Sequence, residues 1–191
     1  MVVPLTGLKV FIGSPGGVEE QREWAKKCLL DMNGIVWKNR YIWIPVRSEE
    51  MHGGLEGQAY IDKNIDDCDF GLFIYSDTWG EGRAKQEFNK MEENHKNAKG
   101  TRDVVVIFKK MSPGTSRNPG PEAQKVIDFK NELLQKKYTI EEYSGNETEF
   151  RKIVEKQLNG WLDDILNGGQ KHIDGVLSVG SGTEENSGGA V

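Results

Sequence analysis

Short runs rich in β-branched and aromatic residues alternate with longer stretches of helical periodicity along most of the chain. The strand-like runs lie at residues 8–13, 41–46, 69–75, 103–109 and 137–143. Each is followed by apolar residues at helical spacing, over about residues 18–33, 57–67, 83–98, 121–136 and 147–166. Parallel neighbours need crossover connections of this kind, so the pattern predicts an α/β domain with a mostly parallel sheet and helices on both faces.

The third and fourth strand-like runs, DFGLFIY and DVVVIFK, are almost continuously apolar, as expected of strands buried on both faces. We therefore expect them at the centre of the sheet. The flavodoxin-like order 2-1-3-4-5 is the usual solution for such units and puts the topological switch point between the first and third strands. A ligand would lie over the carboxyl ends of these strands, where the loops read GSPGGVEEQR and YSDTWGEGR.

The length of 191 residues, with 36% hydrophobic and 29% charged residues, suits one α/β domain with its own core. We assign this domain to residues 1–167. Residues 168–191 hold seven glycines and no sustained periodicity, which is the composition of a flexible tail or of a linker to another domain. No internal repeat is visible.

Charge and composition disfavour several classes of function. The formal net charge is −5, without a stripe of lysine and arginine, so nucleic acid is not the expected ligand. The apolar runs are far shorter than the ~20 residues of a membrane span, and no signal peptide is recognisable. Cys28 and Cys68 lie in apolar surroundings, which predicts buried reduced thiols and a cytoplasmic protein. The three histidines are scattered, so we expect no metal site.

The loop after the first strand, Ser14, Pro15, Gly16 and Gly17, joins that strand to a helix. It matches neither dinucleotide nor P-loop fingerprints. Its small residues permit close approach of the backbone, and N–H groups at the helix start could hold an anion or a ribose phosphate. A tight turn without a ligand explains the same residues equally well. Arg22, in the first turns of the following helix, joins the candidate binding residues.

Glu87 is the sharpest single signal. It lies three residues after Ala84 and four before Met91, on the flank of an apolar helical stripe and just beyond the switch-point loop. A partly desolvated carboxylate there could act in acid–base chemistry or stabilise a developing cation. The alternative is a glutamate that supports the helix dipole and pairs with Arg83 or Lys90.

Two further segments are candidates for contacts with a ligand. The loop of Ser76, Asp77 and Trp79 carries a tryptophan that either stacks on a base or nicotinamide-like ring or covers the top of the sheet. The glycine-rich segment 47–57 is either a mobile lid or, as we favour, a solvated surface loop. The segment 111–123 is expected to be a flexible loop.

Several stretches together resemble the TIR-like family. More narrowly, they resemble a branch labelled a domain of unknown function, which occurs N-terminal to STAND or NACHT ATPases and in bacterial defence genes. The resemblance covers about residues 7–166. Its motifs are KVFIGSPGGVEEQREWAKKCL, QAYIDKNIDDCDFGLFIYSDTWG, VIDFKNELLQKKY and YSGNETEFRKIVEKQLNGWL.

This resemblance implies an activity and its residues. Enzymatic TIR domains cleave the nicotinamide–ribose bond of NAD with a helix glutamate that engages the ribose, and the matching residue is Glu87. By the same resemblance, residues 14–17 and 76–79 form the loops near the nucleotide. NAD is then the substrate, no cofactor or metal is needed, and self-association through the domain is expected.

Three hypotheses follow from the resemblance. The first is a TIR-like NADase, a hydrolase or cyclase that acts in defence or signalling and is activated by self-association. The second is a nucleoside glycosyl-transferring or hydrolysing enzyme like the related nucleoside 2-deoxyribosyltransferases. The third is a catalytically silent TIR-like module that only recruits or oligomerises. Under any of the three, a C-terminal domain or a partner protein could lie beyond the linker.

Overall fold

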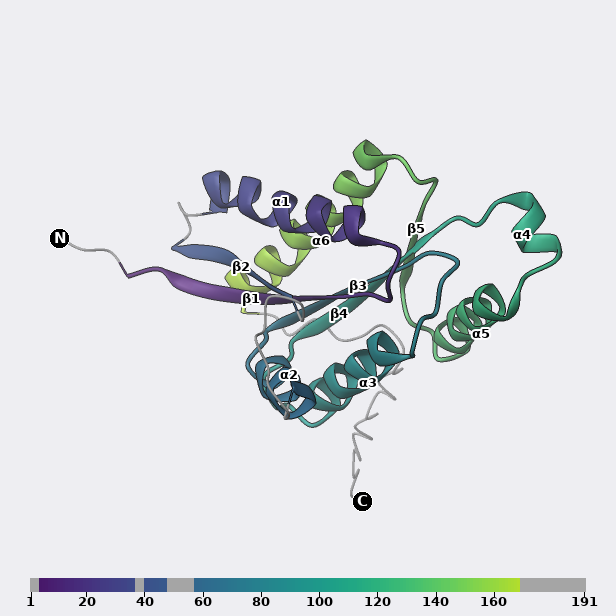
Figure 1. The fold of residues 1–191 in the computed structure, drawn as a ribbon. Helices are drawn as coiled ribbons and strands as arrows, with labels where there is room; N and C mark the ends of the chain where they lie inside the picture. The colour runs from purple at the N-terminus through teal and green to yellow at the C-terminus, as the bar shows by residue number, and fades with distance from the viewer. Residues whose placement is uncertain (1–3, 37–39, 48–56, 169–191) are drawn as a thin grey trace, which may run out of the picture.

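The computed structural model describes residues 4–36, 40–47 and 57–168. Five parallel strands form one sheet in the order β2-β1-β3-β4-β5, which confirms the predicted order and the central place of β3 (Figure 1). The strands are β1 (Thr6–Gly13), β2 (Tyr41–Arg47), β3 (Phe70–Tyr75), β4 (Asp103–Lys109) and β5 (Ile140–Tyr143). The helices are α1 (Glu19–Val36), α2 (Gly57–Asp66), α3 (Arg83–Lys96), α4 (Pro113–Arg117), α5 (Pro121–Gln135) and α6 (Glu147–Leu166).

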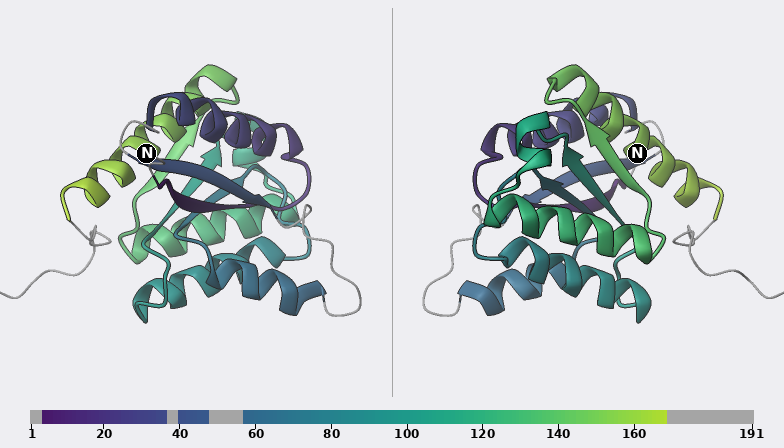
Figure 2. Two further views of the ribbon diagram at one scale, coloured as in Figure 1. Left: turned by 90° about the vertical axis from the view of Figure 1, so that its left-hand side faces the viewer. Right: turned by 90° about the vertical axis from the view of Figure 1, so that its right-hand side faces the viewer.

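The helices form two layers, one on each face of the sheet. Helices α1 and α6 cover one face, while α2, α3 and α5 cover the other (Figures 1 and 2). Side chains alternate along β3, so that Leu72 and Ile74 pack under α1 and α6, whereas Phe73 and Tyr75 pack against α3 and α5. All six residues of β3 are buried, which explains why its sequence is apolar without alternation.

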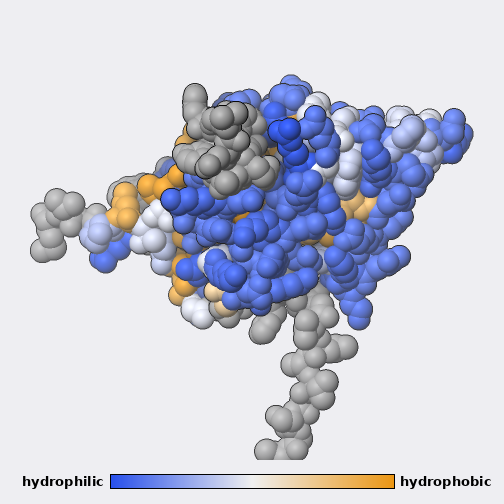
Figure 3. Space-filling model, turned by 60° about the horizontal axis from the view of Figure 1, so that its bottom comes forward, coloured by the Kyte–Doolittle hydropathy of each residue, from blue (hydrophilic) through white to orange (hydrophobic). Residues whose placement is uncertain are grey.

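The outer surface over α2 and α3 is mainly hydrophilic (Figure 3). The inward face of α3 is therefore distinct from its outward face, as the helical periodicity of its apolar residues predicts. This contrast matters for the site, because any charged residue on the inward face is removed from water.

Two elements differ from the predictions. Strand β5 begins at Ile140 instead of residue 137, because Lys137 adopts a left-handed turn (φ 60°) that ends α5. The segment 111–123 is not simply a loop, since it contains helix α4. The side chain of Ser112 caps α4 by accepting a hydrogen bond from the Thr115 N–H (3.1 Å), and Pro113 opens the helix.

Both cysteines are buried free thiols, as predicted. Burial raises the pKa of Cys28 and of Cys68 to about 12, so neither thiol forms a reactive thiolate near neutral pH. No helix within the described residues is long and apolar enough to cross a membrane. Of the predicted tail, residues 169–191 lie outside the described part of the chain.

Candidate functional site

The loops that follow β1 and β3 touch each other at the carboxyl edge of the sheet. Gly13, the last residue of β1, pairs with Phe73 of β3. A Cβ atom built on Gly80 would lie 3.6 Å from the Pro15 Cβ, and one built on Gly17 would lie 3.6 Å from the Thr78 Oγ1. The switch point thus brings together the two loops that the sequence singled out.

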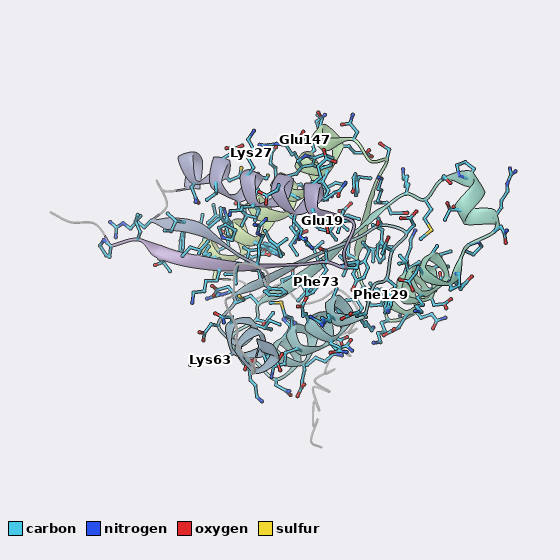
Figure 4. The ribbon with its side chains drawn as sticks, in the orientation of Figure 1. Glu19, Lys27, Lys63, Phe73, Phe129 and Glu147 are labelled. Atoms are coloured by element: carbon cyan, nitrogen blue, oxygen red, sulfur yellow. The ribbon has the colours of Figure 1, made fainter. Side chains whose placement is uncertain are left out.

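The β1–α1 loop is held by its own side chains. The Arg22 guanidinium donates a hydrogen bond to the Ser14 Oγ (2.7 Å) and lies 3.6 Å from the Glu19 carboxylate. The same carboxylate accepts the Gly17 N–H (2.9 Å), and this bond lowers the pKa of Glu19. Glu19 stands at the start of α1, near the end of β1 (Figure 4). One N–H that could hold a ligand anion therefore contacts a carboxylate of the protein.

The β3–α3 loop is held in a similar way by a distant helix. Trp79 and Gly80 donate their N–H groups to one oxygen of Glu122, at 3.1 and 2.8 Å, and Glu122 lies in the first turn of α5. The Trp79 ring packs against Tyr75 and Phe129, with centroids 5.9 and 5.7 Å apart. In this structure the ring covers the aromatic core, the second of the two roles considered for it.

The two remaining loop residues differ in exposure. Ser76 is buried directly after β3, whereas Asp77 is exposed. Phe129, against which the loop packs, lies on the same side of the sheet as Phe73 (Figure 4).

Glu87 is buried more deeply than its sequence position indicated. Helix α3 begins after Gly82, whose left-handed backbone (φ 76°) turns the chain into the helix. The buried face of α3 consists of Ala84, Glu87, Phe88, Met91 and Asn94. Glu87 is 6% exposed and thus lies within the core-facing stripe instead of on its flank.

The cations that a purely structural explanation would pair with Glu87 contact other carboxylates. Arg83 forms an ion pair with Glu81 (2.8 Å), and Lys90 forms one with Asp66 (3.2 Å). Each of these two cations thus has another carboxylate partner.

Tyr75 is electrostatically coupled to Glu87, and it is not among the residues that the sequence singled out. Burial, and then the negative charge of Glu87, raise the pKa of the Tyr75 phenol well above its usual range. The Glu87 charge therefore acts on the Tyr75 phenol through the core. The strand pattern held a signal for it, because alternation along β3 puts Tyr75 on the α3 side together with Phe73.

The structure thus gathers Ser14, Gly17, Arg22 and the 76–80 loop at one edge, with Glu87 at the start of the helix behind that loop. The segment 47–57, the candidate lid, lies mostly outside the described residues. Arg47 at its start pairs with Glu23, while residues 48–56 lie outside the described part of the chain.

Comparison with known proteins gives the family. Residues 9–159 match the model of DUF4062, described as a domain of unknown function. The chain belongs to the DUF4062 family. Among curated proteins, none matches this DUF4062 domain.

A solved structure gives the fold relationship. The DUF4062 domain is similar to TIR domains in the structure of the activated Roq1 resistosome directly recognizing the pathogen effector XopQ. The TM-score is 0.50 with 16% identity, over 79% of this chain and 99% of the Roq1 chain. The expected TIR-like, flavodoxin-like fold is therefore confirmed.

Proposed function

We propose that this DUF4062 domain is a TIR-like NAD-consuming enzyme that cleaves the nicotinamide–ribose bond. The observation that carries the proposal is Glu87, a buried carboxylate one turn into α3, behind the loop at the switch point of a TIR-like sheet. Ligands of open α/β sheets bind at this edge. A carboxylate withdrawn from water there interacts more strongly with a developing positive charge than an exposed one.

The chemistry requires few groups. The bond between the ribose anomeric carbon and the nicotinamide nitrogen breaks, and nicotinamide leaves as a neutral molecule with the bonding electron pair. The ribose becomes cationic in the transition state, where the Glu87 carboxylate stabilises it. In hydrolysis, water forms the new bond to the anomeric carbon and releases a proton. In cyclisation, a nucleophilic atom of the same ADP-ribose forms the new bond to the anomeric carbon.

We further propose that self-association of the domain activates this reaction in a defence or signalling pathway. The support is the similarity to TIR domains of Roq1, which belong to an assembly described as an activated resistosome. The loops after β1 and β3 meet at the carboxyl edge, and the second of them leads into α3, so a neighbouring copy that contacts these loops would act on the helix that carries Glu87.

A second candidate is a catalytically silent TIR-like module that recruits or oligomerises. The observation in its favour is that the N–H groups of Gly17, Trp79 and Gly80 donate to carboxylates of the protein, Glu19 and Glu122. An anionic substrate would have to displace these carboxylates before it could use the same N–H groups.

Nicotinamide release separates the two functions. Concentrated protein, and protein clustered by fusion to an oligomeric scaffold, is incubated with NAD and in parallel with deoxynucleosides. We expect nicotinamide release by the clustered protein and a loss of at least about 100-fold in Glu87→Gln. Glu81→Gln serves as the matched control, because Glu81 is exposed in the same loop and pairs with Arg83.

Three outcomes would redirect the assignment. Release of free base from deoxynucleosides, lost in Glu87→Gln, would favour a deoxyribosyltransferase-like enzyme. Nicotinamide release that survives Glu87→Gln would remove Glu87 from the mechanism. No release from either substrate after clustering would leave the silent module.

A further inference from the structure

Strand β2 forms one edge of the sheet. In the order β2-β1-β3-β4-β5 it pairs with β1 alone, and no other strand of the described residues lies beside it. The free side of an edge strand presents N–H and C=O groups to which another chain can add a strand. Helix α1 lies over this part of the sheet (Figure 1). The backbone groups on the free side of β2 therefore decide whether the sheet can grow there.

Asn33, in the last turn of α1, occupies the free side of β2 at Trp43. Its side-chain amide nitrogen donates a hydrogen bond to the Trp43 carbonyl (2.9 Å), and its amide oxygen accepts the Trp43 N–H (2.7 Å). A carboxamide offers a donor and an acceptor side by side, as the backbone of an extended residue does. Asn33 thus makes with Trp43 the two bonds that the opposite residue of an added antiparallel strand would make.

Pro45 lies on the same free side of the strand. Backbone groups of residues two apart in a strand point to the same side, so Pro45 faces away from β1 as Trp43 does. The bond from the Thr6 N–H to the Arg40 carbonyl (2.8 Å) fits this alternation, since it directs Arg40 toward β1. Proline has no N–H, so the free side offers only a carbonyl at this position.

The core holds Trp43 in place independently of Asn33. The Trp43 residue is 1% exposed, and its ring packs against Phe70 and Trp161 with centroids 5.9 and 6.5 Å apart. Water can satisfy the outward backbone groups of an edge strand. Asparagine is also a weaker helix former than alanine. The bonds from Asn33 therefore matter most for what else can bind to these two backbone groups.

We propose that Asn33 and Pro45 together close the β2 edge and prevent a second copy of this chain from pairing with it. Two β2 strands related by a two-fold axis would meet in an antiparallel pair centred on Trp43. The two Trp43 residues would exchange two bonds, which Asn33 already makes. Each Tyr41 would face a Pro45, which has no N–H to donate. Self-association of the domain then uses a surface other than this edge.

Association of an open-edge variant tests the proposal. Asn33→Ala frees both backbone groups of Trp43, and Pro45→Val restores the missing N–H. Sedimentation velocity compares the double variant with the unaltered protein over the same range of concentrations and without NAD. We expect the double variant to associate at concentrations at least about tenfold lower than the unaltered protein, and each single variant to show a smaller change.

Asn94→Ala is the matched control for a general loss of stability. Asn94 is also a helix asparagine whose amide bonds to another element, but its partner Asp66 belongs to α2 instead of β2. The control should associate as the unaltered protein does. Association of the double variant no stronger than that of the unaltered protein would overturn the proposal. Equally strong association of Asn94→Ala would also overturn it, because partial unfolding would then be the cause.

Amide hydrogen exchange locates the contact between copies. In dilute monomeric protein, Asn33→Ala should raise the exchange rate of the Trp43 amide at least about tenfold, while the Ile44 amide, which faces β1, stays unchanged. In the associated double variant, the Trp43 amide should be protected again. Association that leaves this amide exposed would contradict the proposal, since the copies would then meet elsewhere. None of these measurements involves NAD, so the result does not depend on the proposed NADase function.

Discussion

Helix α3 buries two polar side chains on the same face, and they behave differently. Asn94, near the end of the helix, is 1% exposed and donates a hydrogen bond to the Asp66 carboxylate at 2.7 Å. Glu87, near the start, is 6% exposed, and its charge adds to burial in raising the pKa of the Tyr75 phenol. An amide with a directed partner fastens α3 to α2, whereas a buried carboxylate at the switch-point edge is a candidate for contact with a ligand.

The two ends of α3 lie at opposite edges of the sheet. Polar side chains at these two edges also differ in what they contact. At the amino edge, the Asp69 carboxylate accepts the Lys9 N–H of β1 (2.9 Å). At that edge too, the Trp161 indole of α6 donates to Asp103 (2.6 Å). Polar side chains there join neighbouring elements. At the carboxyl edge, carboxylates contact the loops that follow β1 and β3.

The largest expected effect is a loss of activity at Glu87 without a loss of the fold. Glu87→Gln should lower nicotinamide release at least about 100-fold while the variant remains folded, since glutamine keeps the shape of the buried side chain and removes only its charge. Release assays and thermal unfolding monitored by circular dichroism measure the two effects. If Glu87→Gln lost its stability together with its activity, Glu87 would have a structural role like that of Asn94.

The second prediction concerns Asn94, where we expect a loss of stability without a loss of activity. Asn94→Ala should lower the free energy of unfolding by about 1–2 kcal/mol, because the buried hydrogen bond to Asp66 is lost. Nicotinamide release by the folded variant should remain unchanged. Urea unfolding measures the stability, and Glu93→Ala is the control, since Glu93 is exposed on the same helix. If Asn94→Ala lost nicotinamide release but kept its stability, the two ends of α3 would not differ in the way described above.

The smallest effect concerns the loop that Glu122 holds. Hydrogen bonds from Lys125 and from the N–H groups of Gly80 and Trp79 hold the pKa of Glu122 below its ordinary value of 4.5. Because the folded-state pKa is lowered, the contact is complete above the ordinary pKa and is lost as the pH falls through the lowered one. The amide shifts of Trp79 and Gly80 in an NMR titration should follow this transition.

Glu122→Gln should abolish that transition in the two amide shifts. Glu149→Gln is the control, because Glu149 has a similarly lowered pKa but bonds to Ser144, next to β5. A transition of unchanged midpoint in Glu122→Gln would show that another group controls the loop.

The architecture followed from patterns that are local in the sequence. The alternation of apolar runs with helical periodicity predicted the parallel sheet, and the apolar character of β3 predicted its central place. Helix α6 was predicted at residues 147–166, and it has these bounds. Such features are predictable because burial of a strand or helix face depends on the spacing of residues within that element.

The candidate site was predictable only in part. The strand order predicted that the loops after β1 and β3 meet, and Glu87 was selected because it lies on the flank of an apolar stripe in the sequence. The bonds from Glu122 to the Trp79 and Gly80 N–H groups span more than forty residues, and no local pattern indicates them. The short helix α4 was missed because its cap, Ser112, lies in a segment with the composition of a loop.

From the sequence alone came the order of the strands, the edge of the candidate site and the choice of Glu87 as its candidate carboxylate, because periodicity and chain connectivity encode these features. Only the tertiary structure decided that Glu87 is buried within the core face, that its charge acts on the buried Tyr75 phenol, and that carboxylates of α1 and α5 hold both loops. These properties depend on side chains from separate elements, and only packing brings those elements together.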